Sequence, residues 1–150
     1  MKSIFEEESY IGIVNRLDKL TKQHKPNWGK MSVEQMLVHC RKSVEYAMGD
    51  IELEAKHPVQ VFFYKFQKSS LYNDKPFRKN LNSIKDFIVK EHDSFEEEHK
   101  RLKQIIYRMH TSEKYFFPYT FHQIYGRLEP YEWGRLVYKH LDHHFKQFGV

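Results

Sequence analysis

The stretch Glu132-Trp-Gly-Arg-Leu-Val-Tyr-Lys-His-Leu-Asp-His-His-Phe-Lys-Gln-Phe148 has the hydrophobic period of an α-helix. At about 100° per residue, one stripe of that helix collects Trp133, Leu136, Val137, His140, His144 and Phe148. Such a stripe has to be buried against other apolar surfaces, so it predicts a protein made of packed helices. Pro130 suits the first turn of this helix, and Gly149 follows its expected end.

Two histidines interrupt this apolar stripe. His140 and His144 are four residues apart, which makes them stacked neighbours on a helix with Cβ atoms about 5–6 Å apart. A buried polar pair needs partners, and two readings remain open at this point. The imidazoles either share a metal ion or form hydrogen bonds to other core side chains. Asp142 points the opposite way and cannot orient them from its own helix.

Two further helices are predicted in the first third of the chain. The capping box Ser3-Ile-Phe-Glu6 opens a helix that we expect to reach about Leu20. A loop over residues 21–31 ends it. A second capping box, Ser32-Val-Glu-Gln35, then opens a helix over residues 32–48 that Gly49 terminates.

The middle of the chain has weaker signals. An aromatic-rich segment, Val59 to Leu71, predicts a short helix after Pro58, and Tyr72 to Asn82 reads as an irregular crossing. Asp93 is expected to cap a helix that ends near His110, with acids in its first turn where the helix dipole favours them. Four long amphipathic helices and a short one predict an all-α four-helix bundle in one domain over residues 1–150.

The composition of the chain argues against nucleic-acid-binding and membrane-spanning proteins. The 150 residues carry 25 Lys+Arg against 20 Asp+Glu, a net charge of +5, but no DNA- or RNA-binding motif accompanies the charge. We therefore do not expect nucleic acid as a partner. The longest aromatic run, Val61 to Phe66, is cut by Lys65, so no membrane span is expected. The single cysteine, Cys40, excludes an intrachain disulfide, and the start MKSIFEEESY has no secretion signal, so we expect a cytoplasmic protein.

A catalytic metal site takes three protein ligands and keeps one position open. His140 and His144 supply two, and the other histidines compete for the third place. Periodicity slightly prefers His99, which lies in the apolar stripe of its helix, over His39, which lies at the edge of the stripe of the second helix. Cys40 falls in an apolar stripe and is expected to act as a small hydrophobic residue, and His143 is expected at the solvent or the rim.

Two terminal motifs resemble a known superfamily. Met31-Ser-Val-Glu-Gln-Met-Leu-Val-His39-Cys40, together with Glu132 to Phe148, is similar to the DinB-like (YfiT-like) metal-binding helical bundles, in particular to an uncharacterised bacterial branch. Trp28-Gly29-Lys30 and Lys75-Pro76-Phe77 extend the likeness. The resemblance implies a divalent ion, often zinc or nickel, held by His39, His140 and His144. It thus favours His39 where periodicity alone favours His99.

Two hypotheses of function follow. The first is a metal-dependent enzyme, a thiol-dependent transferase or a hydrolase, acting on a small-molecule substrate; low-molecular-weight thiols are used by members of the superfamily. The basic residues Lys75, Arg78 and Lys79 are candidates for holding the carboxylates of such a thiol. The second is a non-catalytic metal-binding stress protein or a dimeric interaction module. Aromatic residues make up 16% of the chain, which together with the resemblance suggests a homodimer.

Overall fold

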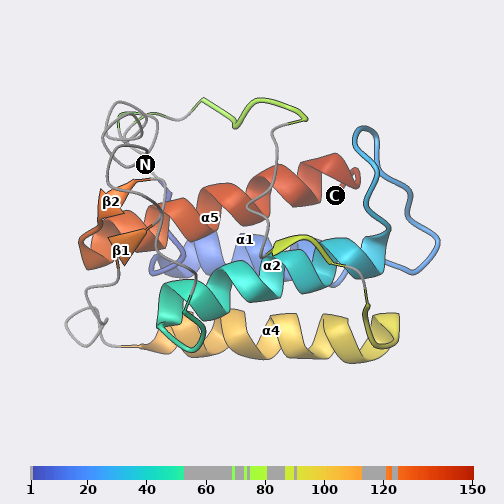
Figure 1. Cartoon of the computed structure of the whole chain (residues 1–150), viewed down its shortest axis with the longest axis horizontal. Coiled ribbons are helices and arrows are strands. Elements are labelled where there is room, and N and C mark those ends of the chain that lie inside the picture. Colours follow the sequence, from blue (N-terminus) through green and yellow to red (C-terminus); the bar gives the residue numbers. More distant parts are fainter. Residues whose placement is uncertain are drawn as a thin grey trace.

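The computed structural model describes residues 2–52, 69, 73, 75–80, 87–89, 91–112, 121–122 and 125–150. Within these ranges the chain forms four α-helices, which are α1 (Glu7–Leu17), α2 (Val33–Met48), α4 (Phe95–Thr111) and α5 (Pro130–Gln147) (Figure 1). A short antiparallel ladder pairs β1 (Phe121–His122) with β2 (Gly126–Arg127) just before α5. None of the helices in these ranges is both long and apolar enough to cross a membrane.

The four helices surround one hydrophobic core. Helix α2 packs against α4 and α5, and α1 packs against α5 and α4. The predicted all-α four-helix bundle is therefore confirmed. The predicted additional helix over residues 59–71 lies outside the described residues except for position 69. Of the predicted crossing over residues 72–82, the described positions 73 and 75–80 are neither helix nor strand, and Asn80 adopts a positive φ of 57° that suits asparagine.

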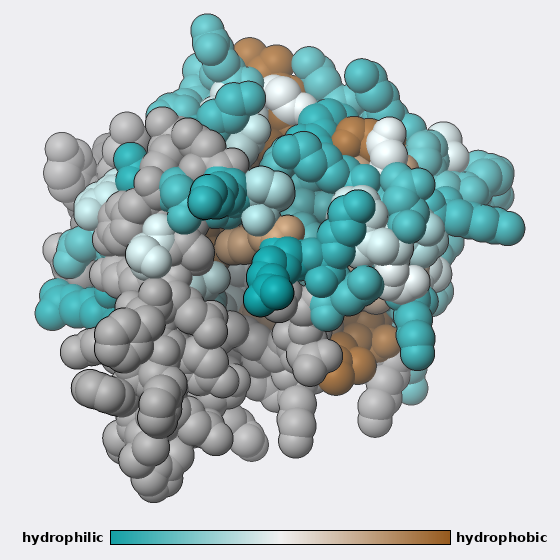
Figure 2. Space-filling view, turned by 90° about the horizontal axis from the view of Figure 1, so that it is seen from above, coloured by the Kyte–Doolittle hydropathy of each residue, from teal (hydrophilic) through white to brown (hydrophobic). Residues whose placement is uncertain are grey.

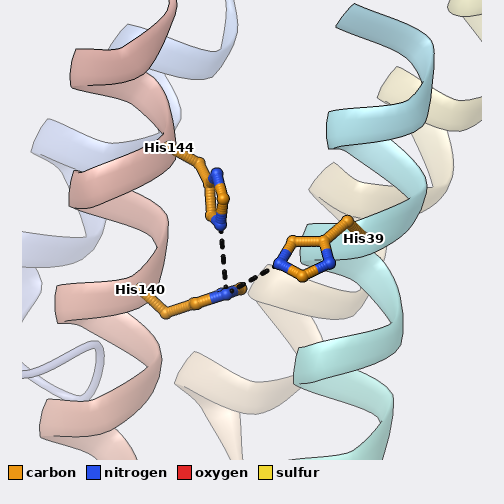
Figure 3. Close-up of side chains that lie close together, drawn as sticks. All are labelled: His39, His140 and His144. Atoms are coloured by element: carbon orange, nitrogen blue, oxygen red, sulfur yellow. Dashed lines mark hydrogen bonds between the residues drawn. The ribbon is translucent and has the colours of Figure 1, made fainter. Parts of the chain in front are cut away.

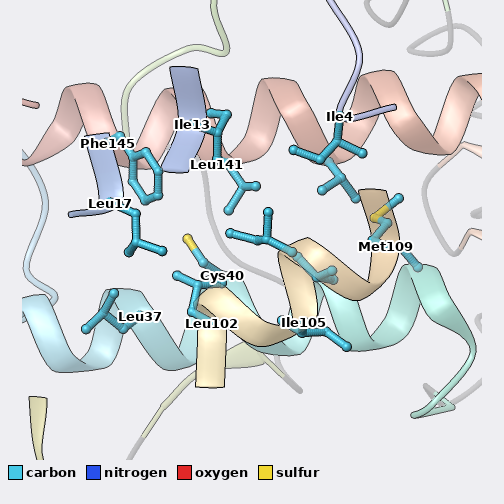
Figure 4. Packing of buried hydrophobic residues seen from close by; sticks show 14 of the residues in the cluster. Ile4, Ile13, Leu17, Leu37, Cys40, Leu102, Ile105, Met109, Leu141 and Phe145 are labelled. Atoms are coloured by element: carbon cyan, nitrogen blue, oxygen red, sulfur yellow. The ribbon is translucent and has the colours of Figure 1, made fainter. Parts of the chain in front are cut away.

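Large aliphatic and aromatic side chains fill the core (Figure 4). Leu141 and Phe145 of α5 are fully buried and lie opposite Leu102 and Cys40 across the bundle. Cys40 is thus a core residue, as its apolar stripe predicted. On α5, His140 and His144 lie beside this core rather than at its centre, on the flank that faces α2 (Figure 3). The fully buried core side chains are Ile4, Ile13, Leu17, Met36, Leu37, Cys40, Val44, Ala47, Leu102, Ile106, Met109, Leu128, Leu141 and Phe145.

The first helix begins later than its capping box predicted. The Glu6 carboxylate accepts a hydrogen bond from the Ser3 amide, but the Ser3 hydroxyl bonds to the amide of Phe5, and Glu6 becomes the residue before α1. The reason is tertiary, because the amide of Ile4 donates to the carbonyl of Gly134 on α5 at 3.0 Å. A Cβ at Gly134 would lie 2.4 Å from Phe5 and from Ser3, so only glycine permits this contact.

The other helix ends follow the sequence more closely. The second capping box forms in full, with the Ser32 hydroxyl accepting from the Gln35 amide, and Gly49 ends α2 in the left-handed region at φ 78°. Ser94 caps α4, whereas the prediction assigned this role to Asp93. Asp93 pairs instead with Arg101 at 2.6 Å. Pro130 is the first residue of α5, as predicted.

Replacing a fully buried leucine should destabilise the bundle strongly. Leu102 of α4 has no exposed surface, and Leu102→Ala should lower the free energy of unfolding by about 2–5 kcal/mol because it leaves a cavity between the helices. Urea denaturation followed by circular dichroism measures this. The matched control is Gln104→Ala at an exposed position of the same helix, expected to change stability by about 0.5 kcal/mol or less. Equal effects of the two substitutions would contradict this packing.

Candidate metal centre

Three histidines from two helices meet in the bundle (Figure 3). His39 projects from α2, and His140 and His144 project from α5 one turn apart. The Nε2 atom of His140 lies 3.0 Å from that of His39 and 3.2 Å from that of His144. One ring nitrogen of each residue lies within 4.8 Å of the others. The structure therefore brings together the three residues that the resemblance implied.

The Nδ1 of His39, which points away from the other two histidines, is bonded to a backbone carbonyl, a group that can only accept a hydrogen bond. Its Nδ1–H donates to the carbonyl oxygen of Phe87 at 3.2 Å, and the Phe87 ring stands edge-on to the imidazole at 5.9 Å. His39 is 4% exposed, so this bond is made away from water. Since a neutral imidazole carries one proton, the Nε2 of His39 has a free lone pair.

His140 is oriented by a serine on the opposite helix. The Ser43 hydroxyl donates its only proton to the carbonyl of Cys40 at 2.8 Å, so its oxygen accepts from the Nδ1–H of His140 at 3.0 Å. His140 is the one member of the group that retains partial exposure. Its Nε2 also lacks a proton and lies between the other two.

His144 is oriented from its own helix. Its Nδ1–H donates to the Oε1 of Gln147 at 2.8 Å, and the Nε2 of Gln147 donates to the backbone carbonyl of Trp28 at 2.6 Å. Both His144 and Gln147 are buried. The Nε2 of His144 therefore also has a free lone pair directed at His140.

Burial keeps the three rings neutral. Loss of solvation lowers the pKa of His39, and it lowers the pKa of His140 well below the usual 6.5, with the neighbouring histidines adding to the effect. The same loss of solvation lowers the pKa of His144 to about 3. At neutral pH no proton is available to separate the three Nε2 atoms, so the lone pairs of His39 and of His144 each face that of His140 across about 3 Å.

This arrangement fits a divalent transition metal. Zinc binds imidazole nitrogens at about 2.0–2.1 Å, so two such ligands at angles between 90° and the tetrahedral value lie about 2.8–3.4 Å apart. The two short nitrogen–nitrogen distances here fall in that range. Each ring also has the outer hydrogen-bond partner that metal-ligating histidines usually have. The chemistry of the group therefore suits zinc, nickel or a similar ion.

The other candidates lie elsewhere. His99, which periodicity preferred, donates from Nε2 to the carbonyl of Leu17 at 3.0 Å and so caps the end of α1. Cys40 is fully buried and burial raises the pKa of its thiol, so it is not poised to form a thiolate. His143 stands edge-on to Trp28 at 5.8 Å and to Phe77 at 6.1 Å, beside the site. Asp142 points away and pairs with Arg16 at 2.7 Å.

Sequence reasoning missed the three acceptors that orient the histidines. Gln147 was within reach of a sequence argument, because it lies three residues after His144 on the same helix, where side chains are neighbours. Ser43 and the Phe87 carbonyl meet their histidines only across the bundle, at separations of 97 and 48 residues. No local pattern signals such contacts.

Comparison with known protein families gives a match over nearly the whole chain. The sequence profile of DUF1569, a family described as proteins of unknown function, matches residues 8–149 and so includes all three histidines. No curated protein and no solved structure matches the chain.

The stability of the metal-free protein should depend on these histidines. Their pKa values are lowered on folding, so below about pH 6.5 the unfolded chain binds more protons than the folded one, and the free energy of unfolding falls with falling pH. Each group that stays neutral contributes a slope approaching about 1.4 kcal/mol per pH unit. Urea denaturation between about pH 7.5 and about pH 5 should show this loss, and His144→Leu should make it shallower. An unchanged slope in that variant would contradict burial of a neutral His144.

Proposed function

The chain belongs to the DUF1569 family, and we propose that it binds one divalent transition-metal ion through His39, His140 and His144. Zinc and nickel are the ions we favour, because three neutral imidazoles suit both and the resemblance to DinB-like bundles implies them. That superfamily relationship is itself part of the proposal.

The observation that carries the proposal is the direction of the three lone pairs. Phe87, Ser43 and Gln147 each accept the Nδ1 proton of one histidine. Three unprotonated nitrogens then meet in a largely buried place, an arrangement that is repulsive without a cation. A hydrogen-bonded cluster of core histidines would instead place a proton between each pair of nitrogens.

We further propose that the site is enzymatic, in a thiol-dependent transferase or a hydrolase. When bound, the ion would lower the pKa of a water or thiol so that it acts as a nucleophile at neutral pH. The three histidines leave room for such a ligand, because catalytic sites of this type use three protein ligands. The partial exposure of His140 supports access to the site from its side.

The charges around the three histidines favour an anionic substrate. Lys42 acts on His39 and lowers its pKa further, and no carboxylate of the described residues is among the charges that shift the pKa of the three rings. A divalent ion held by neutral imidazoles keeps its full charge. A thiolate or a carboxylate would offset it.

A basic and aromatic wall beside His144 supports the same substrate class. The His143 ring lies 5.1 Å from that of His144 and meets Trp28 and Phe77 edge-on. The Lys79 ammonium lies over the Trp28 ring at 4.4 Å, and among the described residues Lys79 has neither a hydrogen bond nor an ion pair. In Figure 1 the segment 75–80, in green, lies above α5. We therefore propose that Lys79 binds a carboxylate of a small-molecule substrate.

A non-catalytic metal-binding protein is the second candidate. No carboxylate of the described residues is among the charges that shift the pKa of the three rings, so no carboxylate is assigned as general base, and a storage or structural role for the ion is the alternative. Assays of thiol conjugation and of amide and ester hydrolysis separate the two candidates. Activity that a chelator removes and added metal restores would support the enzyme.

Homodimerisation stays a prediction. The face seen in Figure 2 is mainly hydrophilic over its described part, and its brown areas are small and separated. The exposed large apolar side chains of the described residues, Ile11, Ile88, Tyr107 and Tyr131, come from four different segments.

Metal content tests the binding proposal directly. The protein purified without added metal should carry close to one equivalent of a transition metal by mass spectrometry, and His39→Ala, His140→Ala and His144→Ala should each lose most of it. The matched control is His143→Ala on the same helix, which should keep the metal because its ring faces Trp28 and Phe77. The same trace content in all five proteins would overturn the proposal.

The anionic substrate class can be tested with two thiols that differ in charge. Calorimetry on the zinc-loaded protein should show that Lys79→Gln weakens binding of mercaptosuccinate by about 3–10-fold, the effect of losing one exposed ion pair, and changes binding of mercaptoethanol less than about twofold. Lys100→Gln, at an exposed position of α4, is the control. Equal weakening of both thiols would argue against a carboxylate at Lys79.

A further inference from the structure

Gln147 makes three hydrogen bonds from a buried position at the end of α5. Its Oε1 accepts from His144 Nδ1 at 2.8 Å, its Nε2 donates to the Trp28 carbonyl at 2.6 Å, and its own carbonyl accepts from the Asn27 amide at 2.7 Å. The residue is 4% exposed. It connects one of the three histidines to a loop that is more than a hundred residues away in sequence.

Together these hydrogen bonds determine which ring nitrogen of His144 carries the proton. A backbone carbonyl can only accept, so the amide nitrogen of Gln147 has to face Trp28. The amide oxygen then faces His144 and requires a proton on Nδ1. The backbone of Trp28 thereby determines, through Gln147, that the Nε2 of His144 presents a lone pair to His140.

The loop Asn27–Gly29 is fitted closely to Gln147. Gly29 adopts a φ of 84°, and a Cβ there would lie 2.6 Å from the Nε2 of Gln147. The Asn27 side chain also reaches the carbonyl of Lys146 at 3.5 Å. The Trp28 ring, held by this loop, packs against His143 beside the three histidines. A change in the position of the Gln147 side-chain amide would therefore displace the loop that carries Trp28.

We propose that Gln147 is a positioning residue that couples the three-histidine site to the loop Asn27–Gly29. The side-chain oxygen of Gln147 holds His144 in the tautomer that can bind a metal. Its side-chain nitrogen is bonded to the Trp28 carbonyl, so a movement of His144 on metal binding also moves the Trp28 backbone. The coupling to metal rests on the proposed function, whereas the control of the tautomer does not. Metal binding at His144 therefore changes how firmly the Trp28 loop is held against the site.

Two substitutions separate the oxygen from the nitrogen. Gln147→Met removes both hydrogen bonds of the side chain at similar length. Gln147→Glu keeps an oxygen for His144 and, as the carboxylate, has no donor for Trp28. The matched control is Gln104→Met, at an exposed position of α4.

The tautomer is measured in the metal-free protein by nitrogen-15 NMR of the imidazoles. We expect a protonated Nδ1 on His144 in the wild type, in Gln147→Glu and in the control, and a mixture of both tautomers in Gln147→Met. A purely structural glutamine would not change which nitrogen carries the proton. An unchanged tautomer in a folded Gln147→Met protein would overturn the positioning role.

Metal affinity is measured by titration with Co²⁺, followed by its visible absorption. Gln147→Met should weaken Co²⁺ binding by about 10–100-fold, as for other residues that orient metal ligands, and Gln147→Glu by no more than about threefold. Wild-type affinity in Gln147→Met would overturn the positioning role. Absence of binding in the wild type as well as the control would instead overturn the proposed function and with it the coupling.

The coupling is measured by hydrogen exchange at the amides of residues 27–29. Co²⁺ should slow this exchange in the wild type by at least about threefold and leave it unchanged in Gln147→Glu, which binds the ion but lacks the bond to Trp28. Equal slowing in both proteins would show that the loop responds by another route and would overturn the coupling.

Discussion

The outward hydrogen bond of each histidine is the interaction on which the candidate site depends. A neutral imidazole has one proton, and a buried acceptor on one side of the ring draws that proton there. Phe87, Ser43 and Gln147 do this for His39, His140 and His144. The inner nitrogens are left without protons only because all three acceptors are present together. Burial reinforces the effect, since it keeps the rings neutral.

The bundle supplies these acceptors from distant parts of the chain. The packing of α2 against α5 sets His39 opposite His140 and also brings Ser43 to the outer nitrogen of His140. The segment around Phe87 and the loop around Trp28 add the remaining contacts from either side. Because these parts share one rigid core, a site of three small rings is positioned to within hydrogen-bond distance. The core beside it, with Leu141 and Phe145 fully buried, keeps α5 from rotating.

Local sequence signals predicted the helices well where capping and periodicity agree. The capping box at Ser32 and the glycine at position 49 fix both ends of α2, and Pro130 marks the start of α5. The same kind of signal failed at Ser3, because a backbone bond from Ile4 to Gly134 removes that turn from the helix. The same signal assigned the cap of α4 to Asp93 instead of the neighbouring Ser94, because it did not reveal that the Asp93 carboxylate pairs with Arg101 eight residues further along. The first of these errors has a tertiary contact as its cause, and the second has a local one.

By itself the sequence determined the four helices and the pairing of His140 with His144, because both follow from spacing along a single helix. It did not determine the third member of the group: periodicity favoured His99, and only the resemblance pointed to His39. The tertiary structure decided this, since it turns His99 towards the end of α1 and His39 towards α5. It also decided which nitrogen of each ring carries the proton. That choice depends on hydrogen-bond acceptors contributed by other segments of the chain. The order of residues along the sequence does not show which segments come into contact in the fold.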